Sequence, residues 1–196
     1  MQIWDVSLQN KHEIAKNAAA FLKKGKVLVF PTDTVYGLVA DATNRKAVQK
    51  IFQIKGRKQG KPLPIFVNSI TMAKTLAKVS SLQEKYMRKV WPGKVTLVLE
   101  SKGVLPKETG TAKSIGLRIP KHELLQAILK KARRPLTGTS ANLAGNPPFS
   151  DGKAVLKEFQ EKKYAPDILI DAGRLSRSYP SKVIDITETT PKVLRK

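Results

Sequence analysis

Two groups of polar side chains in the first third of the chain are suited to binding a small anion. Thr32, Asp33 and Thr34 place two hydroxyls and a carboxylate on a turn directly after an apolar run. A cationic loop follows later, and its charged residues are Lys55, Arg57, Lys58 and Lys61. Fixed cations and hydroxyls hold phosphates and carboxylates well. On one strand–helix–strand unit, the two groups would form a site for an anionic small molecule.

Both groups also have a simpler interpretation. Threonine-rich turns commonly satisfy their own backbone, and loops rich in Lys and Arg are commonly solvated surface. Other residue types exclude several chemistries. The absence of cysteine removes disulfides, thiolate nucleophiles and cysteine-based metal sites. His12 and His122 have no neighbouring ligand at metal spacing, so we expect structural or surface roles for both.

The chain is strongly basic, with 37 Lys and Arg against 15 Asp and Glu, a net charge of +22. Such a field attracts polyanions and accelerates encounter with them. The alternative is that the surface is rich in Lys without serving one specific partner. The N-terminus lacks an apolar signal core, and no apolar run reaches membrane-spanning length. We therefore expect a cytoplasmic protein without a membrane partner.

The elements that must position the two polar groups are predicted around them. Val27–Phe30 is a short apolar run ended by Pro31, which predicts a buried strand. Val35–Ala40 predicts a second strand, and Asn44 caps a helix that Gly56 ends. Pro62–Val67 returns to an apolar strand. Elsewhere we expect helices from Asn10 to Gly25 and over 71–79, 80–90, 123–131 and 152–162, and strands over 2–6, 95–99, 115–119, 135–139, 168–170, 183–186 and 193–194.

This alternation of strands and short-linked helices predicts an α/β fold of α+β type with a mixed sheet. The 196 residues fit one domain with a sizeable core. We therefore expect residues 1–196 to form a single domain without an additional C-terminal domain.

Four ordered sequence blocks resemble the YrdC-like threonylcarbamoyl-AMP synthase family. They are PTDTVYGL with IFQIKGRKQGKPL, then WPGKVTLVL, SIGLRIPKH and PLTGTSANLAGNPPFS, and PSKVIDIT with KVLR extends the match to the C-terminus. The chain departs from the family at four points. Phe66 stands where many members carry a His, Lys94 and Lys182 replace a usual Pro and Thr, and the Gly-rich loop before Pro180-Ser181 is missing.

The resemblance implies a twisted, mixed open sheet flanked by helices around a basic central cavity. It also implies synthesis of threonylcarbamoyl-AMP and pyrophosphate from L-threonine, bicarbonate and ATP. Mg²⁺ would enter with ATP, without a tightly bound protein-ligated metal. Threonylcarbamoyl-transfer proteins would then modify tRNA, which a basic surface on this chain would attract. No enzyme-bound intermediate is implied, in agreement with the lack of a Cys or Ser–His–Asp nucleophile.

The same resemblance assigns roles to individual residues. From their residue types, Lys55 and Arg57 are expected to hold phosphate and the transition-state charge, with Lys61 assisting. The nucleotide-contacting positions match Arg57, Lys61, Ser114, Asn142, Ser150 and Arg195. The threonine-contacting positions match Thr34, Arg118, Ser140 and Ser181. Some of these have structural alternatives, because Arg118 could form an ion pair, Asn142 could cap the next segment and Ser181 could be a turn hydroxyl.

Two rival functions remain open at this stage. One is a YrdC-like paralogue that binds RNA or nucleotide with little adenylation activity, which Phe66 and Lys94 favour and the intact Lys55-Gly56-Arg57 run opposes. The other is a purely structural RNA-binding domain, which the charge favours and the motif order does not. A P-loop ATPase is excluded because the chain has no Gly-Lys-Ser/Thr phosphate loop.

Overall fold

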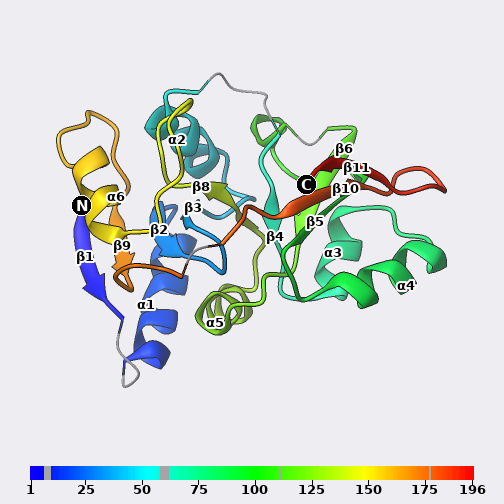
Figure 1. Ribbon diagram of the computed structural model, residues 1–196, viewed down its shortest axis with the longest axis horizontal. Helices are drawn as coiled ribbons and strands as arrows, with labels where there is room; N and C mark the ends of the chain where they lie inside the picture. The colour runs from blue at the N-terminus through cyan, green and yellow to red at the C-terminus, as the bar shows by residue number, and fades with distance from the viewer. Residues whose placement is uncertain (7–9, 58–61, 111, 177) are drawn as a thin grey trace.

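The computed structural model describes residues 1–6, 10–57, 62–110, 112–176 and 178–196. Their strands form two mixed sheets side by side, with helices on both sides (Figure 1). The predicted α/β class with mixed pairing is confirmed. The predicted single sheet is divided in two, however, and the division creates the space between them. Among the described residues, no helix is long and apolar enough to cross a membrane.

The first sheet has the strand order β1–β9–β2–β3–β8. Its strands are β1 (Gln2–Asp5), β9 (Ile168–Asp171), β2 (Leu28–Pro31), β3 (Tyr36–Val39) and β8 (Thr139–Ser140). β9 pairs in parallel with β1 and β2, whereas β3 pairs antiparallel with β2 and β8. Every residue of β2 and β3 is buried, as their unbroken apolar runs predict.

Helices cover both faces of this sheet. Leu28 and Phe30 pack in one apolar cluster with α1 (Lys11–Lys23) and α5 (Glu123–Ala132), while Val29 packs in another with α2 (Arg45–Lys55) and α6 (Gly152–Phe159). This alternation follows from the two-residue period of a strand. α2 begins and ends as predicted, because the Asn44 side chain accepts from the Ala47 N–H and Gly56 adopts the left-handed conformation. The α6 helix ends at Phe159, three residues before the predicted end at Lys162.

The second sheet has the order β11–β10–β5–β6–β4–β7. Its strands are β11 (Lys192–Arg195), β10 (Lys182–Asp185), β5 (Val95–Glu100), β6 (Ser114–Arg118), β4 (Ile65–Phe66) and β7 (Leu136–Thr137). Beside it lie α3 (Ile70–Leu76), α4 (Ser81–Val90) and the short 3-10 helix η1 (Lys107–Thr109). The α3 helix ends at Leu76 rather than at the predicted Val79, because Ala77 is extended and bridges to Ser101.

The chain crosses between the sheets at Gly138. The prediction of one continuous strand from Pro135 to Thr139 is wrong, because β7 pairs with β4 in the second sheet and β8 with β3 in the first. The Gly138 N–H donates to the Pro64 carbonyl at 2.7 Å, and a Cβ at this position would lie 2.7 Å from the Phe66 ring. Only glycine allows the backbone to approach Phe66 so closely. The crossing therefore brings the Ser140-Ala141-Asn142 loop to the junction of the two sheets.

Candidate active site

A cavity of about 450 Å³ lies at the junction of the two sheets, which is within the size range of small-molecule sites. Strands β3 and β8 of the first sheet and β4, β5, β6 and β11 of the second contribute to its lining. The predicted site residues that line it are Thr34, Arg57, Arg118, Ser140, Asn142, Ser181 and Arg195. The fold thus gathers side chains from most of the length of the chain around one space.

Three arginines, Arg57, Arg118 and Arg195, make this cavity basic. Burial lowers the pKa of Arg118, and the charge of Arg195 lowers it further, while Asp33 opposes both effects. No ion pair with a carboxylate forms at Arg57 or Arg195 within the described ranges. These two guanidinium groups therefore keep their charge available to an anionic ligand.

Arg118 is held by an ion pair that the sequence interpretation offered as its structural alternative. Its Nη2 donates to both carboxylate oxygens of Asp33 at 2.7 and 2.6 Å, and its Nε donates to the Gly93 carbonyl at 2.9 Å. The two side chains are 4% and 9% exposed, and the guanidinium lies 5.9 Å from the centre of the Phe66 ring. Asp33, which the resemblance left without a role, therefore fixes Arg118 at the cavity wall.

The hydroxyl turn before β3 is built by its own side chains. Thr32 Oγ1 donates to the Val35 carbonyl at 2.7 Å and accepts from the Thr34 N–H at 3.1 Å. The hydroxyls of Thr32 and Thr34 lie 3.0 Å apart, and both residues line the cavity. Thr32 thus satisfies the turn backbone, as the simpler interpretation proposed, and in doing so directs Thr34 to the cavity.

On the opposite wall, Ser181 is held between two strands. Arg195 on β11 donates from Nε and Nη2 to the Ser181 carbonyl at 3.1 and 2.7 Å. The Ser181 hydroxyl lies 3.1 Å from the hydroxyl of Thr96 on β5. Thr96 is a cavity residue that the sequence interpretation missed, although a buried polar residue within the apolar Val95–Leu99 run was the signal that could have found it.

Lys55 lies behind the cavity and supports the loop that carries Ser140 and Asn142. Its Nζ donates to the carbonyls of Ser140 and Asn142 at 2.7 and 2.9 Å and to Asn142 Oδ1 at 3.2 Å. These bonds use the three donors of an ammonium group. Lys55 lines a smaller adjoining pocket of about 270 Å³ together with Arg57. The geometry gives Lys55 a positioning contact with the loop, and its predicted phosphate contact stays a prediction.

Burial, and secondarily the charge of Arg57, lowers the pKa of Lys55 from 10.5 to about 8. The unfolded chain therefore binds more protons than the folded protein between pH 8 and 10.5, and stability rises across this window. Relative to Lys55→Met, the native protein should gain about 1–2 kcal/mol between pH 7.5 and 9.5. Urea unfolding of both proteins at the two pH values measures this difference. A pH-independent difference would contradict the low pKa.

Two other predicted residues, Ser114 and Ser150, do not line the cavity. Ser114 lies on β6 opposite Glu100, and Ser150 is exposed, with its carbonyl accepting from the Leu175 N–H at 2.7 Å. Lys61 lies outside the described residues. The nucleotide contacts assigned to these three residues stay predictions.

The histidines have the structural and surface positions expected of them. His122 accepts the Leu125 N–H at 3.4 Å through Nδ1, capping α5, and packs edge-on against Phe30. Burial lowers its pKa, so the neutral form that can accept this bond is favoured. His12 is exposed beside Lys131. Within the described part of the chain, no group of three or more His, Asp or Glu side chains could hold a metal ion.

Comparison with known protein families agrees with the arrangement of the cavity. The Sua5/YciO/YrdC family model, described as "Telomere recombination", matches residues 20–196. The chain belongs to this family. Membership confirms the resemblance seen in the four sequence blocks, and it accounts for the mixed sheets around a shared cavity.

Relatives within the Sua5/YciO/YrdC family include named enzymes and a protein of unassigned activity. The threonylcarbamoyl-AMP synthase of Pyrococcus abyssi is 37% identical over 180 residues, covering 91% of this chain and 52% of that protein. The crystal structure of P. abyssi Sua5 complexed with L-threonine superposes with a TM-score of 0.91 at 34% identity, covering 100% of this chain and 57% of that one. Escherichia coli YciO superposes with a TM-score of 0.86 at 26% identity, covering 100% and 95%.

The chain spans about half the length of the curated synthases from Pyrococcus abyssi and Bacillus subtilis, at 52% and 56%. The shared part contains all of the cavity described above.

Proposed function

We propose that this protein is an L-threonylcarbamoyladenylate synthase, an enzyme that transfers the adenylyl group of ATP to threonine carbamate. The observation that carries the proposal is the convergence of Arg57, Arg195, Thr34, Ser140 and Asn142 on one basic cavity. The structure of P. abyssi Sua5 complexed with L-threonine, which superposes with a TM-score of 0.91, supports the amino-acid half of the site.

The reaction needs charge and positioning more than a nucleophile. The threonine amine attacks the carbon of bicarbonate-derived carbon dioxide, giving a carbamate and releasing a proton. A carbamate oxygen then attacks the α-phosphorus of ATP, and the bond to the β-phosphate oxygen breaks to release pyrophosphate. Arg57 binds the phosphates and neutralises the charge that develops on them, because fixed cations in a shielded site need no reorganisation during the reaction.

The amino acid binds between Thr34 and Ser140 on the side of the first sheet and Arg118 and Ser181 on the side of the second. The hydroxyls of Thr34, Ser140 and Ser181 offer donors and acceptors to the substrate's polar groups. Arg118, oriented by Asp33, presents its charge to the threonine carboxylate. Holding both substrates in one cavity converts their encounter into an intramolecular step. Mg²⁺ enters as the ATP complex, with phosphate oxygens rather than protein carboxylates as its main ligands.

The product serves tRNA threonylcarbamoyladenosine modification in the cytoplasm, where transfer proteins complete the reaction. The 196 residues act as one domain in this synthesis. Exposed cations on the paired helices α1 and α5, namely Lys16, Lys23 and Lys130, and Arg133 directly after α5, attract the tRNA backbone. Binding should be dominated by phosphates, so affinity falls steeply with salt and tRNA and generic duplex RNA bind alike. A salt titration of both RNAs tests this, and tight binding to a single tRNA at high salt would contradict it.

Pyrophosphate release should require L-threonine and bicarbonate together. Each omission should reduce release from Mg²⁺-ATP to the background rate, because the carbamate that attacks the α-phosphorus cannot then form. The measurement is coupled pyrophosphate detection with four mixtures: complete, without threonine, without bicarbonate, and with serine in place of threonine. Release that does not depend on threonine or bicarbonate, or no release in the complete mixture, would overturn the assignment.

A YciO-like nucleotide- or RNA-binding protein with little adenylation activity is the second candidate. The observation that favours it is Phe66, an apolar ring at the cavity wall where a polar residue was expected, together with the Arg118–Asp33 pair that occupies the guanidinium. The two candidates differ in one measurement. The second candidate predicts that, in the complete mixture, the protein binds ATP without releasing pyrophosphate.

A further inference from the structure

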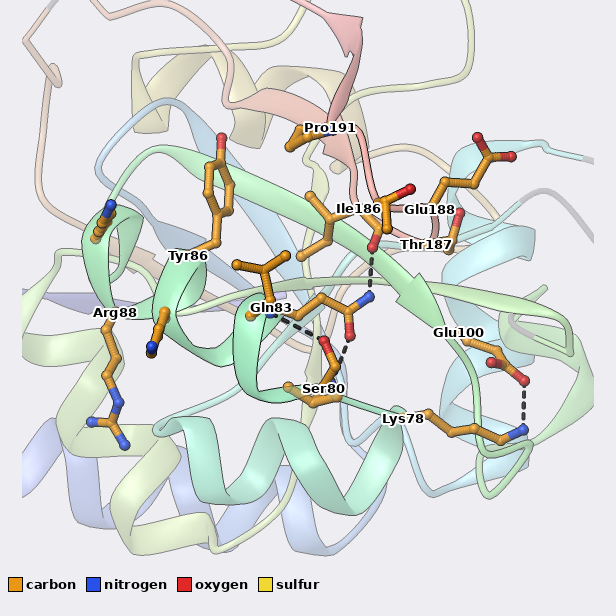
Figure 2. Close-up of a pocket in the computed structure, with 15 residues that line it drawn as sticks. Lys78, Ser80, Gln83, Tyr86, Arg88, Glu100, Ile186, Thr187, Glu188 and Pro191 are labelled. Carbon is orange, nitrogen blue, oxygen red and sulfur yellow. Dashed lines mark hydrogen bonds and ion pairs between the residues drawn. The ribbon is translucent and has the colours of Figure 1, made fainter.

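A second and larger hollow, here called the α4 groove, lies between α4 and the turn that joins β10 to β11. Its volume is about 940 Å³. The apolar residues that line it are Val79, Leu82, Tyr86, Ile186 and Pro191. In Figure 2, Tyr86, Ile186 and Pro191 gather on one side of the groove, while Arg88 points away from them. This groove shares no lining residue with the candidate active site.

The walls of the α4 groove are fixed by hydrogen bonds. The Gln83 Oε1 accepts from the Ser80 N–H at 2.8 Å, and the Ser80 side chain accepts from the Gln83 N–H at 3.2 Å, which forms a capping box. The same Gln83 amide donates from Nε2 to the Ile186 carbonyl at 2.6 Å. One side chain therefore both starts α4 and ties the hairpin to it (Figure 2). Such a preformed groove loses little conformational entropy when it binds a ligand.

The charges along the groove are of three kinds. Glu188, in the turn between β10 and β11, is exposed and forms no ion pair within the described residues. Lys78 pairs with Glu100 at 2.6 Å, and Arg88 pairs with Glu84 at 2.5 Å, so these cations are already neutralised. Lys85 and Lys89 are exposed on α4, one helical turn apart, and form no ion pair within the described ranges. Like charges at this spacing destabilise a helix, and acidic groups placed between them would relieve the repulsion.

Leu82, an apolar residue in the first turn of α4, is 65% exposed. A leucine at this position does not add stability to the isolated fold, because a polar residue in the first turn of α4 would serve equally well. Leu82, Tyr86 and Ile186 line the same groove, whose border carries two unpaired lysines and one unpaired glutamate within the described residues. Apolar surface rimmed by charge is typical of a protein-binding site.

We propose that the α4 groove binds an acidic amphipathic helix of a partner protein. The apolar face of that helix would pack on Leu82, Tyr86 and Pro191, and its carboxylates would pair with Lys85 and Lys89. Nucleic acid would leave the apolar floor uncovered, because its outer surface is phosphate and sugar. A helix laid in a groove buries apolar and acidic groups at once.

The position of the groove places such a partner near the candidate active site. The turn that borders the groove joins β10 to β11, and the other end of this hairpin carries Ser181 and Arg195 at the cavity wall. A protein seated on the groove would therefore lie next to the strands that hold the proposed substrate site.

The test uses a labelled synthetic peptide of about 18 residues, or five helical turns, with leucines on one face and glutamates on the other. A shuffled peptide of the same composition has no apolar face. Fluorescence anisotropy at physiological salt should show at least tenfold tighter binding of the amphipathic peptide. Leu82→Asp should weaken that binding tenfold or more, and so should Lys85→Glu with Lys89→Glu.

Matched variants separate the groove from the general charge of the chain. Val104 is 59% exposed elsewhere, so Val104→Asp controls for the loss of an exposed apolar residue. Lys153 and Lys157 are exposed on α6 at the same spacing, so their double change to Glu controls for charge reversal. Both controls should bind like the native protein. Leu82→Asp is compatible with folding, because an acidic residue is favourable in the first turn of a helix.

Three outcomes would overturn the proposal. Equal binding of the shuffled peptide, or equal losses in the control variants, would show generic charge attraction. Self-association in sedimentation that Leu82→Asp abolishes would assign the groove to a second copy of this chain. Duplex RNA that displaces the peptide and loses affinity in the Lys85/Lys89 variant would assign it to RNA. Peptide binding is measured separately from pyrophosphate release, so either proposal can fail without the other.

Discussion

Replacing Arg57 with alanine is expected to lower threonine- and bicarbonate-dependent pyrophosphate release about 10²–10³-fold, which is about 3–4 kcal/mol of transition-state stabilisation. Arg57 lines both the cavity and the smaller pocket beside Lys55, and within the described ranges it pairs with no carboxylate. Its charge is therefore free to bind phosphate, and its removal leaves no buried partner behind. Steady-state kinetics with circular dichroism of the variant measures both effects.

A matched control for Arg57→Ala is Arg88→Ala. Arg88 is an exposed arginine on α4 that pairs with Glu84, away from the cavity. The Arg88→Ala variant should retain the native turnover and the native fold. Native turnover in the Arg57 variant would show that this side chain is solvated surface, and an unfolded variant would show that its role is structural.

Replacing Asp33 with asparagine is expected to destabilise the fold by about 3–5 kcal/mol, because it leaves the buried Arg118 charge without its partner. The two side chains are only 4% and 9% exposed, so water does little to replace the lost carboxylate. Urea unfolding measures the loss. As a control, Glu100→Gln breaks the exposed pair with Lys78 and should cost at most about 1 kcal/mol.

The double change Asp33→Asn with Arg118→Met separates the two roles of Arg118. Removing both charges should recover most of the stability, because neither buried charge is then left unpaired. Activity should not return, since the proposed threonine carboxylate contact is lost. A double variant that is both stable and active would show that Arg118 serves only the fold. A single Asp33→Asn variant as stable as the native protein would show that solvent reaches the guanidinium.

The sequence by itself determined most of the local elements and, through the family resemblance, seven of the residues that line the cavity. Asn44 and Gly56 delimited α2 because a cap and a left-handed terminator are local requirements that the neighbouring residues reveal. The apolar runs of β2 and β3 also predicted buried strands, because this signal too lies in neighbouring residues. The chemistry of the site also followed from residue types, because hydroxyls and guanidinium groups suit only a limited set of ligands.

Only the tertiary structure decided which of these groups meet. Nothing in the local sequence indicates that Asp33 pairs with Arg118, 85 residues away, or that Lys55 supports the Ser140–Asn142 loop. The strand over 135–139 was predicted as one continuous strand, and its division at Gly138 depends on the distant Phe66 ring. Such contacts depend on how the two sheets pack, and the pattern of neighbouring residues carries no information about that packing.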